Sequence, residues 1–284
     1  MFSYSLAACA GVLDFVLWIN IGYRMRHIIK FGFILGLAAS SNAFSADPVQ
    51  GFYLGLLGQL SHAPNTNLSF SLPDGNTYNG SVKLSIVGGG VGGSIGYKIR
   101  NFRLEGELLF NINNYGSLNV GSCTLISPDV LGPNGNCSAF IENTGLAFNG
   151  NTMGYYGLFN TFYDFLSSDP TVNFVPYLGL GLGGAMIKNH ALFHSNNQCI
   201  SLGTCSPIVS QTLNTSSNGF AIQGIVGFNY YLDDFTTLGL DFRYLSTVNF
   251  NKNNTSAVTN SNNSNYGIGT INITANFALE KGGD

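Results

Sequence analysis

The chain has 284 residues and a formal net charge of −3. Only 9% of its residues are charged, against about 25% in ordinary soluble domains, whereas Phe, Tyr and Gly are abundant. This composition argues against an ordinary soluble domain and against nucleic acid as a partner. A secreted β protein solvated by its many Asn side chains is the alternative.

The N-terminal region predicts export. Residues 25–46, "MRHIIKFGFILGLAASSNAFSA", have a basic start, an apolar core and small residues before a cleavage site, as signal peptides do. Residues 1–24 are interpreted as an upstream mis-start or an extended leader, and residues 47–284 as the mature domain. Loss of residues 1–46 removes three basic residues and one acid, which takes the net charge from −3 to −5.

The mature region carries alternating apolar and polar segments of about ten residues, which is typical of membrane-spanning β-strands. Eight such segments are found, at residues 50–60, 83–97, 102–112, 152–165, 174–187, 219–231, 236–248 and 266–279. The connections alternate in length. Those at 98–101, 166–173 and 232–235 are short, and those at 61–82, 113–151, 188–218 and 249–265 are long and polar.

Short connections on one side and long ones on the other are the pattern of outer-membrane barrels. The sequence therefore predicts an all-β fold: an eight-stranded antiparallel up-and-down transmembrane β-barrel with long extracellular loops and short periplasmic turns.

Charged residues on the predicted strands are expected to face the barrel interior. In "FRLEGELLF" (102–110) and "LGLDFRYL" (238–245) the charges alternate with apolar residues that would meet lipid. Five side chains should form an inward polar network, because unpaired buried charges are costly: Arg103, Glu105, Glu107, Asp241 and Arg243. Glu105 and Glu107 are interpreted as structural partners of the arginines rather than as an acid–base pair.

Two features of the expected lumen point in opposite directions. Large inward side chains favour a filled interior: Tyr156, Phe162, Gln223 and Tyr231. Small inward residues favour a gap: Gly179, Gly181 and Gly183. A surface-display barrel and a narrow passive channel for small solutes therefore both remain open.

Several segments in this order resemble the opacity-protein-like surface antigens of Gram-negative bacteria. They are "GFYLGLLGQL" (51–60), "FRLEGELLF", "FVPYLGLGLGG" (174–184), "IVGFNYYL" (225–232) and "LGLDFRYL". The resemblance implies an outer-membrane barrel whose loops meet host factors. Such chains end on an aromatic residue that the barrel-insertion machinery recognises. Here Phe277 would be that signal, although seven residues follow it.

Catalysis and metal binding are not expected. The mature histidines, His62, His190 and His194, are predicted to lie in loops. Ser61 and Ser195 adjoin two of them, but neither long loop contains an obvious orienting acid besides Asp74. We therefore expect no enzymatic activity, no metal and no cofactor.

The mature cysteines fall in two pairs, one in each of two long loops, and none is expected in a strand. An oxidising compartment favours their pairing, and four cysteines allow three connectivities. Local encounter favours Cys123–Cys137 and Cys199–Cys205.

These features predict a protein of the bacterial outer membrane that presents four long loops, for adhesion, host interaction or envelope structure. The expected partners are outer-membrane lipid and lipopolysaccharide, the barrel-insertion machinery, and a host-surface ligand bound by the loops.

Overall fold

The structure is a computed structural model of the chain and describes residues 50–85, 87–126, 132–167, 173–254 and 266–279. The expected leader and signal peptide, residues 1–46, lie outside the described residues. Within the described part, no helix is both long and apolar enough to cross a bilayer.

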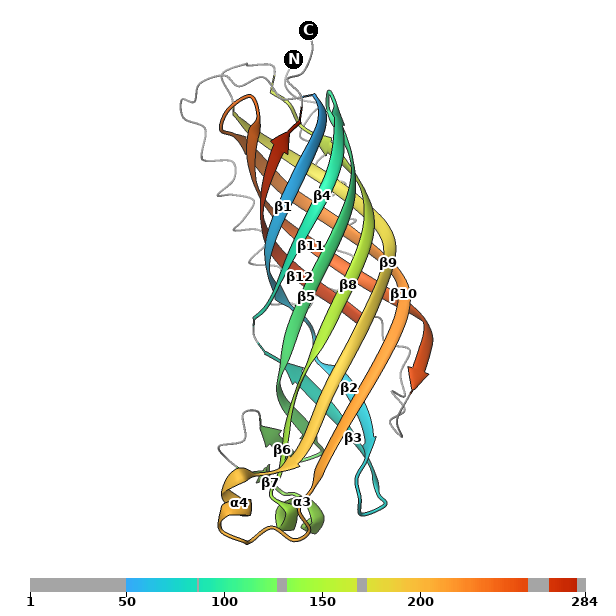
Figure 1. The fold of residues 1–284 in the computed structure, drawn as a ribbon, viewed down its shortest axis with the longest axis vertical. Helices are drawn as coiled ribbons and strands as arrows, with labels where there is room; N and C mark the ends of the chain where they lie inside the picture. Colours follow the sequence, from blue (N-terminus) through green and yellow to red (C-terminus); the bar gives the residue numbers. More distant parts are fainter. Residues whose placement is uncertain (1–49, 86, 127–131, 168–172, 255–265, 280–284) are drawn as a thin grey trace, which may run out of the picture. The chain divides into compact units, whose positions relative to one another are not determined.

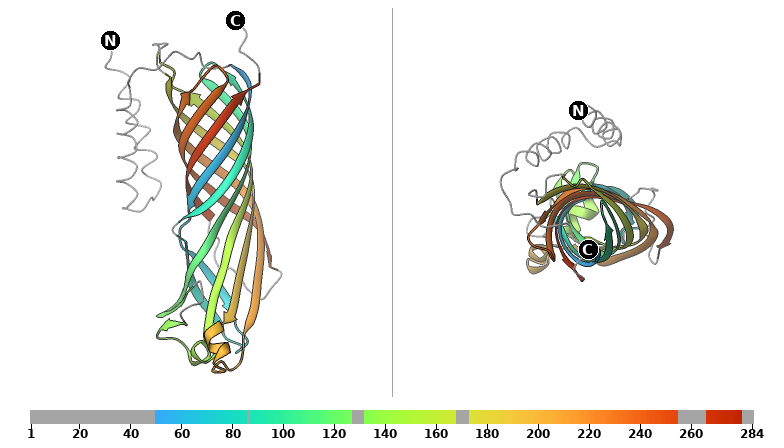
Figure 2. Two further views of the ribbon diagram at one scale, coloured as in Figure 1. Left: turned by 60° about the vertical axis from the view of Figure 1, so that its left-hand side comes forward. Right: turned by 90° about the horizontal axis from the view of Figure 1, so that it is seen from above.

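Eight antiparallel strands form a closed ring (Figures 1 and 2). They are β1 (Gly51–His62), β4 (Gly88–Ile99), β5 (Phe102–Val120), β8 (Leu146–Asp164), β9 (Phe174–Ser195), β10 (Ser210–Tyr231), β11 (Thr236–Asn254) and β12 (Tyr266–Ala278). The last strand closes on the first, with Tyr53 opposite Ala278 and His62 opposite Gly269. The predicted eight-stranded up-and-down barrel is therefore confirmed.

The two faces of the wall differ in chemistry as the alternation predicts. On β5, the side chains of Leu104 and Leu108 are 43% and 73% exposed, whereas Glu105 and Glu107 are 5% and 4% exposed. Because successive side chains of a strand point to opposite faces, one face of the wall is apolar and the other lines the lumen with charge.

Aromatic pairs border the apolar outer band at two levels. At the end with the short connections, which we name the turn end, Phe102 contacts Tyr163 with ring centroids 5.1 Å apart. Further along the same two strands Phe110 contacts Tyr155, also at 5.1 Å. The nine residues from Phe102 to Phe110 match the length of about 9–11 residues with which a tilted strand crosses the hydrocarbon.

Four strands continue well past the second aromatic level: β5, β8, β9 and β10. Around their ends lie four short strands and two short helices: β2 (Thr66–Ser71), β3 (Thr77–Leu84), β6 (Cys123–Ile126), β7 (Asn134–Gly135), α3 (Ala139–Thr144) and α4 (Asn197–Ser201). The β2–β3 hairpin extends the sheet by pairing β3 with β5. We name this assembly, at the end opposite the turns, the distal layer (Figure 1).

The distal layer corrects several expectations. The segment expected at 83–97 is divided between the end of β3 and the beginning of β4. Much of 113–151 and 188–218 is regular strand rather than loop. The three histidines expected in loops lie on strands, His62 on β1 and both His190 and His194 on β9. These polar segments have a composition typical of loops, but pairing with neighbouring strands makes them regular.

The closed ring predicts heat-modifiable migration. A barrel without an unpaired edge can open only by breaking many ladder hydrogen bonds together, so the folded protein should resist detergent until it is boiled. Electrophoresis of boiled and unboiled samples should give two different mobilities. Identical mobility would contradict the closed barrel.

Candidate functional site

The lumen near the turn end holds a buried ion-pair cluster centred on Asp164. Lys98 donates to this carboxylate at 2.7 Å, and Arg103 Nε donates to its other oxygen at 3.0 Å. The Lys98 ammonium also donates to the hydroxyl of Tyr231. Because all of these groups are buried, each charge depends on its partners rather than on water.

A second ion-pair cluster is centred on Arg243. Its Nη1 donates to Glu107 at 2.5 Å, and its Nε donates to Asp241 at 2.8 Å. Asp241 also accepts hydrogen bonds from Tyr177 at 2.9 Å and from Asn272 at 2.6 Å. The carboxylate of Asp241 is thus satisfied by charged and neutral donors together, which is what a buried anion requires.

Neutral side chains complete this network. Asn160 Nδ2 lies 3.4 Å from both Glu105 and Glu107, and Gln223 donates to Asn160 at 2.7 Å. Glu105 also accepts from the hydroxyl of Tyr53 at 3.0 Å. The structure therefore places Glu107 against an arginine, whereas none of the ion pairs between described residues includes Glu105, which is held by neutral donors instead.

Two members of the network were missed from sequence. The connection expected at 98–101 includes Lys98, and the expected inward network does not include Asp164. In the structure Lys98 donates to Tyr231 and to Asp164, and Arg103 also donates to Asp164. The signal was available. Ser94, Gly96 and Lys98 are spaced two residues apart on β4 and therefore share one face of the strand. Their burial indicates that this face is the inward one.

Side chains fill the lumen around these clusters. The cavities here include one of about 30 Å³ beside Lys98 and one of about 10 Å³ beside Glu107. One water needs about 10–15 Å³, so each cavity has room for no more than a few waters. The inward glycines leave no gap, because a Cβ at Gly181 would collide with Asn160 and Gln223.

An apolar cluster lies beyond the polar network and continues into the distal layer. Within the barrel it includes Leu57, Leu109, Leu158, Leu245 and Ile268, and in the layer Phe70, Leu118, Phe148 and Phe193. Phe193 stacks on Phe70 with centroids 4.4 Å apart and contacts Phe148 at 5.2 Å. The interior of the ring and the distal layer thus share one hydrophobic core.

The β2–β3 hairpin covers this core. Its turn is closed by Asp74, which accepts from the backbone and side chain of Asn76 and, at 2.6 Å, from the hydroxyl of Tyr78. Slight burial alone would raise the pKa of Asp74, but the hydrogen bonds from Tyr78 and Asn76 outweigh it and hold that pKa below its usual value. The same hydrogen bonds fix the turn between β2 and β3.

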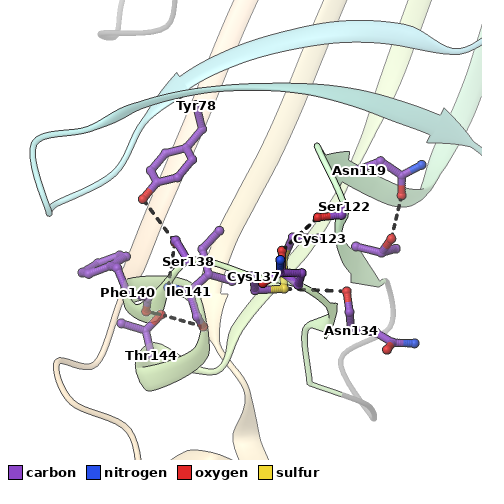
Figure 3. Close-up of a disulfide and its surroundings, with 12 residues drawn as sticks. Tyr78, Asn119, Ser122, Cys123, Asn134, Cys137, Ser138, Phe140, Ile141 and Thr144 are labelled. Atoms are coloured by element: carbon purple, nitrogen blue, oxygen red, sulfur yellow. Dashed lines mark hydrogen bonds between the residues drawn. A yellow bond between two sulfur atoms is a disulfide. The ribbon is translucent and has the colours of Figure 1, made fainter.

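A disulfide joins β6 to the segment before α3. Cys123 bonds to Cys137 (Figure 3), and Cys123 is 2% exposed within the hydrophobic core. Ser138 then caps α3, since its side chain accepts from the backbone of Ile141, and the hydroxyl of Tyr78 lies 3.4 Å from it. The expectation that no cysteine lies in a strand is wrong for Cys123, which belongs to β6.

A second disulfide, Cys199–Cys205, closes a smaller ring that begins in α4. We name residues 199–205 the distal ring. Backbone hydrogen bonds attach its flanks to α3 and its C-cap: Ser206 donates to Asn143 at 3.1 Å and Asn196 donates to Gly145 at 2.8 Å. The connection between β5 and β8 and the connection between β9 and β10 are therefore joined within the distal layer.

Removing the first disulfide, with Cys123→Ser and Cys137→Ser together, should loosen the distal layer and leave the membrane-spanning strands intact. A ring of this length contributes roughly 3 kcal/mol in the chain-entropy model, and two hydroxyl groups would replace sulfurs beside the core. Limited proteolysis of the folded variant should cut within residues 117–145, while circular dichroism keeps its β signal. Loss of that β signal would contradict the separation of the two parts.

The two serines named from sequence, Ser61 and Ser195, form hydrogen bonds with groups other than histidine. The hydroxyl of Ser61 donates to Asn113, and that of Ser195 accepts from the backbone of Val209. His190 faces an amide, with Nδ1 2.6 Å from Asn214. No cluster of metal-ligating side chains is found among the described residues.

An eight-stranded ring with an apolar outer band, aromatic borders and a filled polar lumen defines an integral outer-membrane barrel. The family model described as "Outer membrane protein beta-barrel domain" matches residues 31–277. The chain belongs to this family and is a protein of the bacterial outer membrane. The turn end is therefore periplasmic and the distal layer extracellular. No curated protein matches the sequence.

Solved structures that resemble the chain include three outer-membrane barrels. Neisserial surface protein A is 15% identical, with a TM-score of 0.35, over 81% of this chain and 99% of its own. Ail, the attachment invasion locus protein of Yersinia pestis, is 12% identical, with a TM-score of 0.40, over 80% and 98%. OprG of Pseudomonas aeruginosa is 11% identical, with a TM-score of 0.42, over 83% and 97%. Similarity at this level carries no information on the role of the present chain.

Proposed function

We propose that this protein is a surface-display barrel whose distal layer binds a partner outside the cell, in adhesion or host interaction. The observation that carries the proposal is the hydrophobic core shared by the lumen and the distal layer. This core seals the barrel and also holds the extracellular elements in one conformation. An ordered binding surface loses less conformational entropy on association than a flexible loop does.

The filled lumen argues against the alternative of a passive channel. Ion pairs and large side chains occupy the part of the barrel that a solute would have to cross. The inward glycines that favoured a gap are matched to bulky neighbours, because Phe162 packs against Gly179. A catalytic role has no support from Ser61 or Ser195, whose hydroxyls are engaged in structural hydrogen bonds.

Two envelope partners belong to the same proposal. Phe277 lies on β12 with its side chain 43% exposed on the outer face, where the barrel-insertion machinery could read it as the C-terminal signal. Lipopolysaccharide would surround the barrel above the second aromatic level, where the ammonium of Lys188 lies 5.4 Å from the ring centre of Tyr155. This cation is suited to a lipid phosphate.

Display on a non-adherent laboratory Gram-negative strain tests the proposal. The variant for comparison has residues 64–86, 114–151 and 189–215 each replaced by a short Gly-Ser connection, which removes the distal layer. Cells displaying the full protein should adhere to cultured host cells above the vector control, and cells displaying equal amounts of the trimmed, heat-modifiable barrel should not. Equal adherence of the two, or none by the full protein, would contradict the proposal.

A further inference from the structure

Three large aliphatic side chains are exposed at and beside the distal ring. Ile200 is 41% exposed, Leu202 is 68% exposed, and Ile208 is 64% exposed. The first of them belongs to α4, which lies at the end of the fold farthest from the periplasmic turns (Figure 1). The three lie within nine residues of one another in the chain, in a segment without charged residues, and exposed apolar groups so close together indicate a site of interaction.

These side chains belong to an ordered element. The Cys199–Cys205 bond closes the ring, and Thr204 donates to the carbonyl of Cys199 across it at 3.1 Å. Ser206 donates to Asn143 of α3, which ties the ring to the neighbouring connection. The aliphatic groups are therefore held outward by covalent and hydrogen-bonded constraints, so little ordering remains to be done when they bind.

The hydrocarbon of the protein's own membrane cannot cover them. Its outer boundary lies near Tyr155, which is paired with Met186 on β9. From Met186 the strand continues to Ser195, which at about 3.3 Å per residue and the usual tilt raises the ring roughly 20 Å above that boundary. Whatever covers the aliphatic groups must approach from outside the cell.

Charge and composition favour a lipid surface as the occupant. Residues 189–232 contain no Asp, Glu, Lys or Arg, and the one charged residue of the adjoining α3 is Glu142. Residues 196–209 contain no aromatic residue either. Protein-binding hot spots are enriched in Trp, Tyr and Arg and poor in Leu, whereas a bilayer accepts aliphatic groups without any charged complement.

We propose that the distal ring and Ile208 beside it form a membrane-docking tip, which inserts Ile200, Leu202 and Ile208 into a facing bilayer of zwitterionic lipid. This inference rests on the proposed function and names the chemistry of its partner. Because residues 189–232 and α3 contain no Lys or Arg, the tip should bind neutral bilayers and gain nothing from anionic lipid.

Flotation with sealed phosphatidylcholine vesicles tests the tip, with the full mature protein held in lipid nanodiscs. The wild type should float with the vesicles. Replacing the three aliphatic residues with Ile200→Ser, Leu202→Ser and Ile208→Ser should weaken binding about a thousandfold, at about tenfold for each buried side chain. Val87→Ser is the matched control, since Val87 is an aliphatic residue 56% exposed outside the ring, and it should stay within twofold of the wild type.

Adding anionic lipid to the vesicles should leave wild-type binding unchanged, and a tenfold gain would overturn the neutral-lipid assignment. Failure of the wild type to float, or equal binding by the triple variant, would overturn the tip itself. The adherence of displaying cells is measured separately. If cells adhere, depend on the three residues and yet bind no vesicle, the partner of the ring is a protein and the proposed function stands. If the cells do not adhere, the proposed function is contradicted whatever the vesicle result.

Discussion

Arg243→Met should lower the free energy of unfolding by about 3–5 kcal/mol, because breaking a buried ion pair leaves uncompensated charge. Arg243 pairs with Glu107 at 2.5 Å and with Asp241 at 2.8 Å, and all three side chains are almost fully buried. Methionine keeps most of the volume of arginine but none of its donors. Two carboxylates would then face each other across the lumen without a cation between them.

Urea unfolding of the protein in detergent micelles measures this loss. Far-ultraviolet circular dichroism and gel mobility monitor the unfolding. Leu240→Val, on the lipid-facing side of the same strand, is the control and should cost no more than about 1.5 kcal/mol. Combining Arg243→Met with Glu107→Gln and Asp241→Asn should recover much of the loss by removing the stranded charges. An Arg243→Met variant within 1 kcal/mol of the wild type, on the scale of a small surface effect, would contradict the network.

Phe193→Ala should loosen the distal layer without opening the barrel. Phe193 is fully buried and contacts both Phe70 of the hairpin and Phe148 of β8. Truncating a buried Phe typically costs about 3–5 kcal/mol through lost burial and the cavity that remains. The hairpin depends on this contact for its position, so it should detach before the membrane-spanning strands do.

Limited proteolysis of folded protein measures that detachment. The Phe193→Ala variant should be cleaved within residues 64–85 at least tenfold faster than the wild type, since local opening limits cleavage, and should still migrate as a heat-modifiable barrel. Ile208→Ala, at a side chain that is 64% exposed, removes a large aliphatic group outside the core and should not change the cleavage rate. Equal cleavage of the Phe193→Ala variant and the wild type would show that the hairpin does not rest on this core.

The barrel could be predicted because its signal is local. Alternation along β5 assigns Leu104 and Leu108 to one face and Glu105 to the other whichever strand lies alongside. The alternation of short and long connections then sets the direction of each strand. Neither step requires knowledge of a distant contact.

The distal layer could not be predicted in the same way. The segment "SQTLNTSSNG" (210–219) is polar and typical of loops, yet it forms the beginning of β10. β9 supplies paired residues along all of it, and β11 pairs with it from Thr215 onward. Phe70 and Phe193 are isolated aromatics in polar surroundings, and nothing local indicates that they stack. Such long-range packing is a tertiary property, and it overrides local composition.

The candidate site was partly accessible from sequence. The alternation of side chains along each strand is enough to indicate inward positions for Glu107, Asp241 and Arg243. The partner of each charge depends instead on how far neighbouring strands are staggered around the barrel. Arg103 consequently pairs with Asp164, at the end of a neighbouring strand, rather than with either glutamate. The exposed aliphatic tip has no periodic signal at all, since it lies on a short helix and an irregular turn.

Side chains seal the lumen of this barrel. Conductance of the purified, heat-modifiable protein in a planar bilayer tests the sealed lumen most directly. The network around Arg243 and the apolar core above it predict a membrane current no different from that of protein-free bilayers across a range of voltages. Stable single-channel openings, abolished when the folded protein is boiled before addition, would contradict the sealed barrel and favour the passive channel.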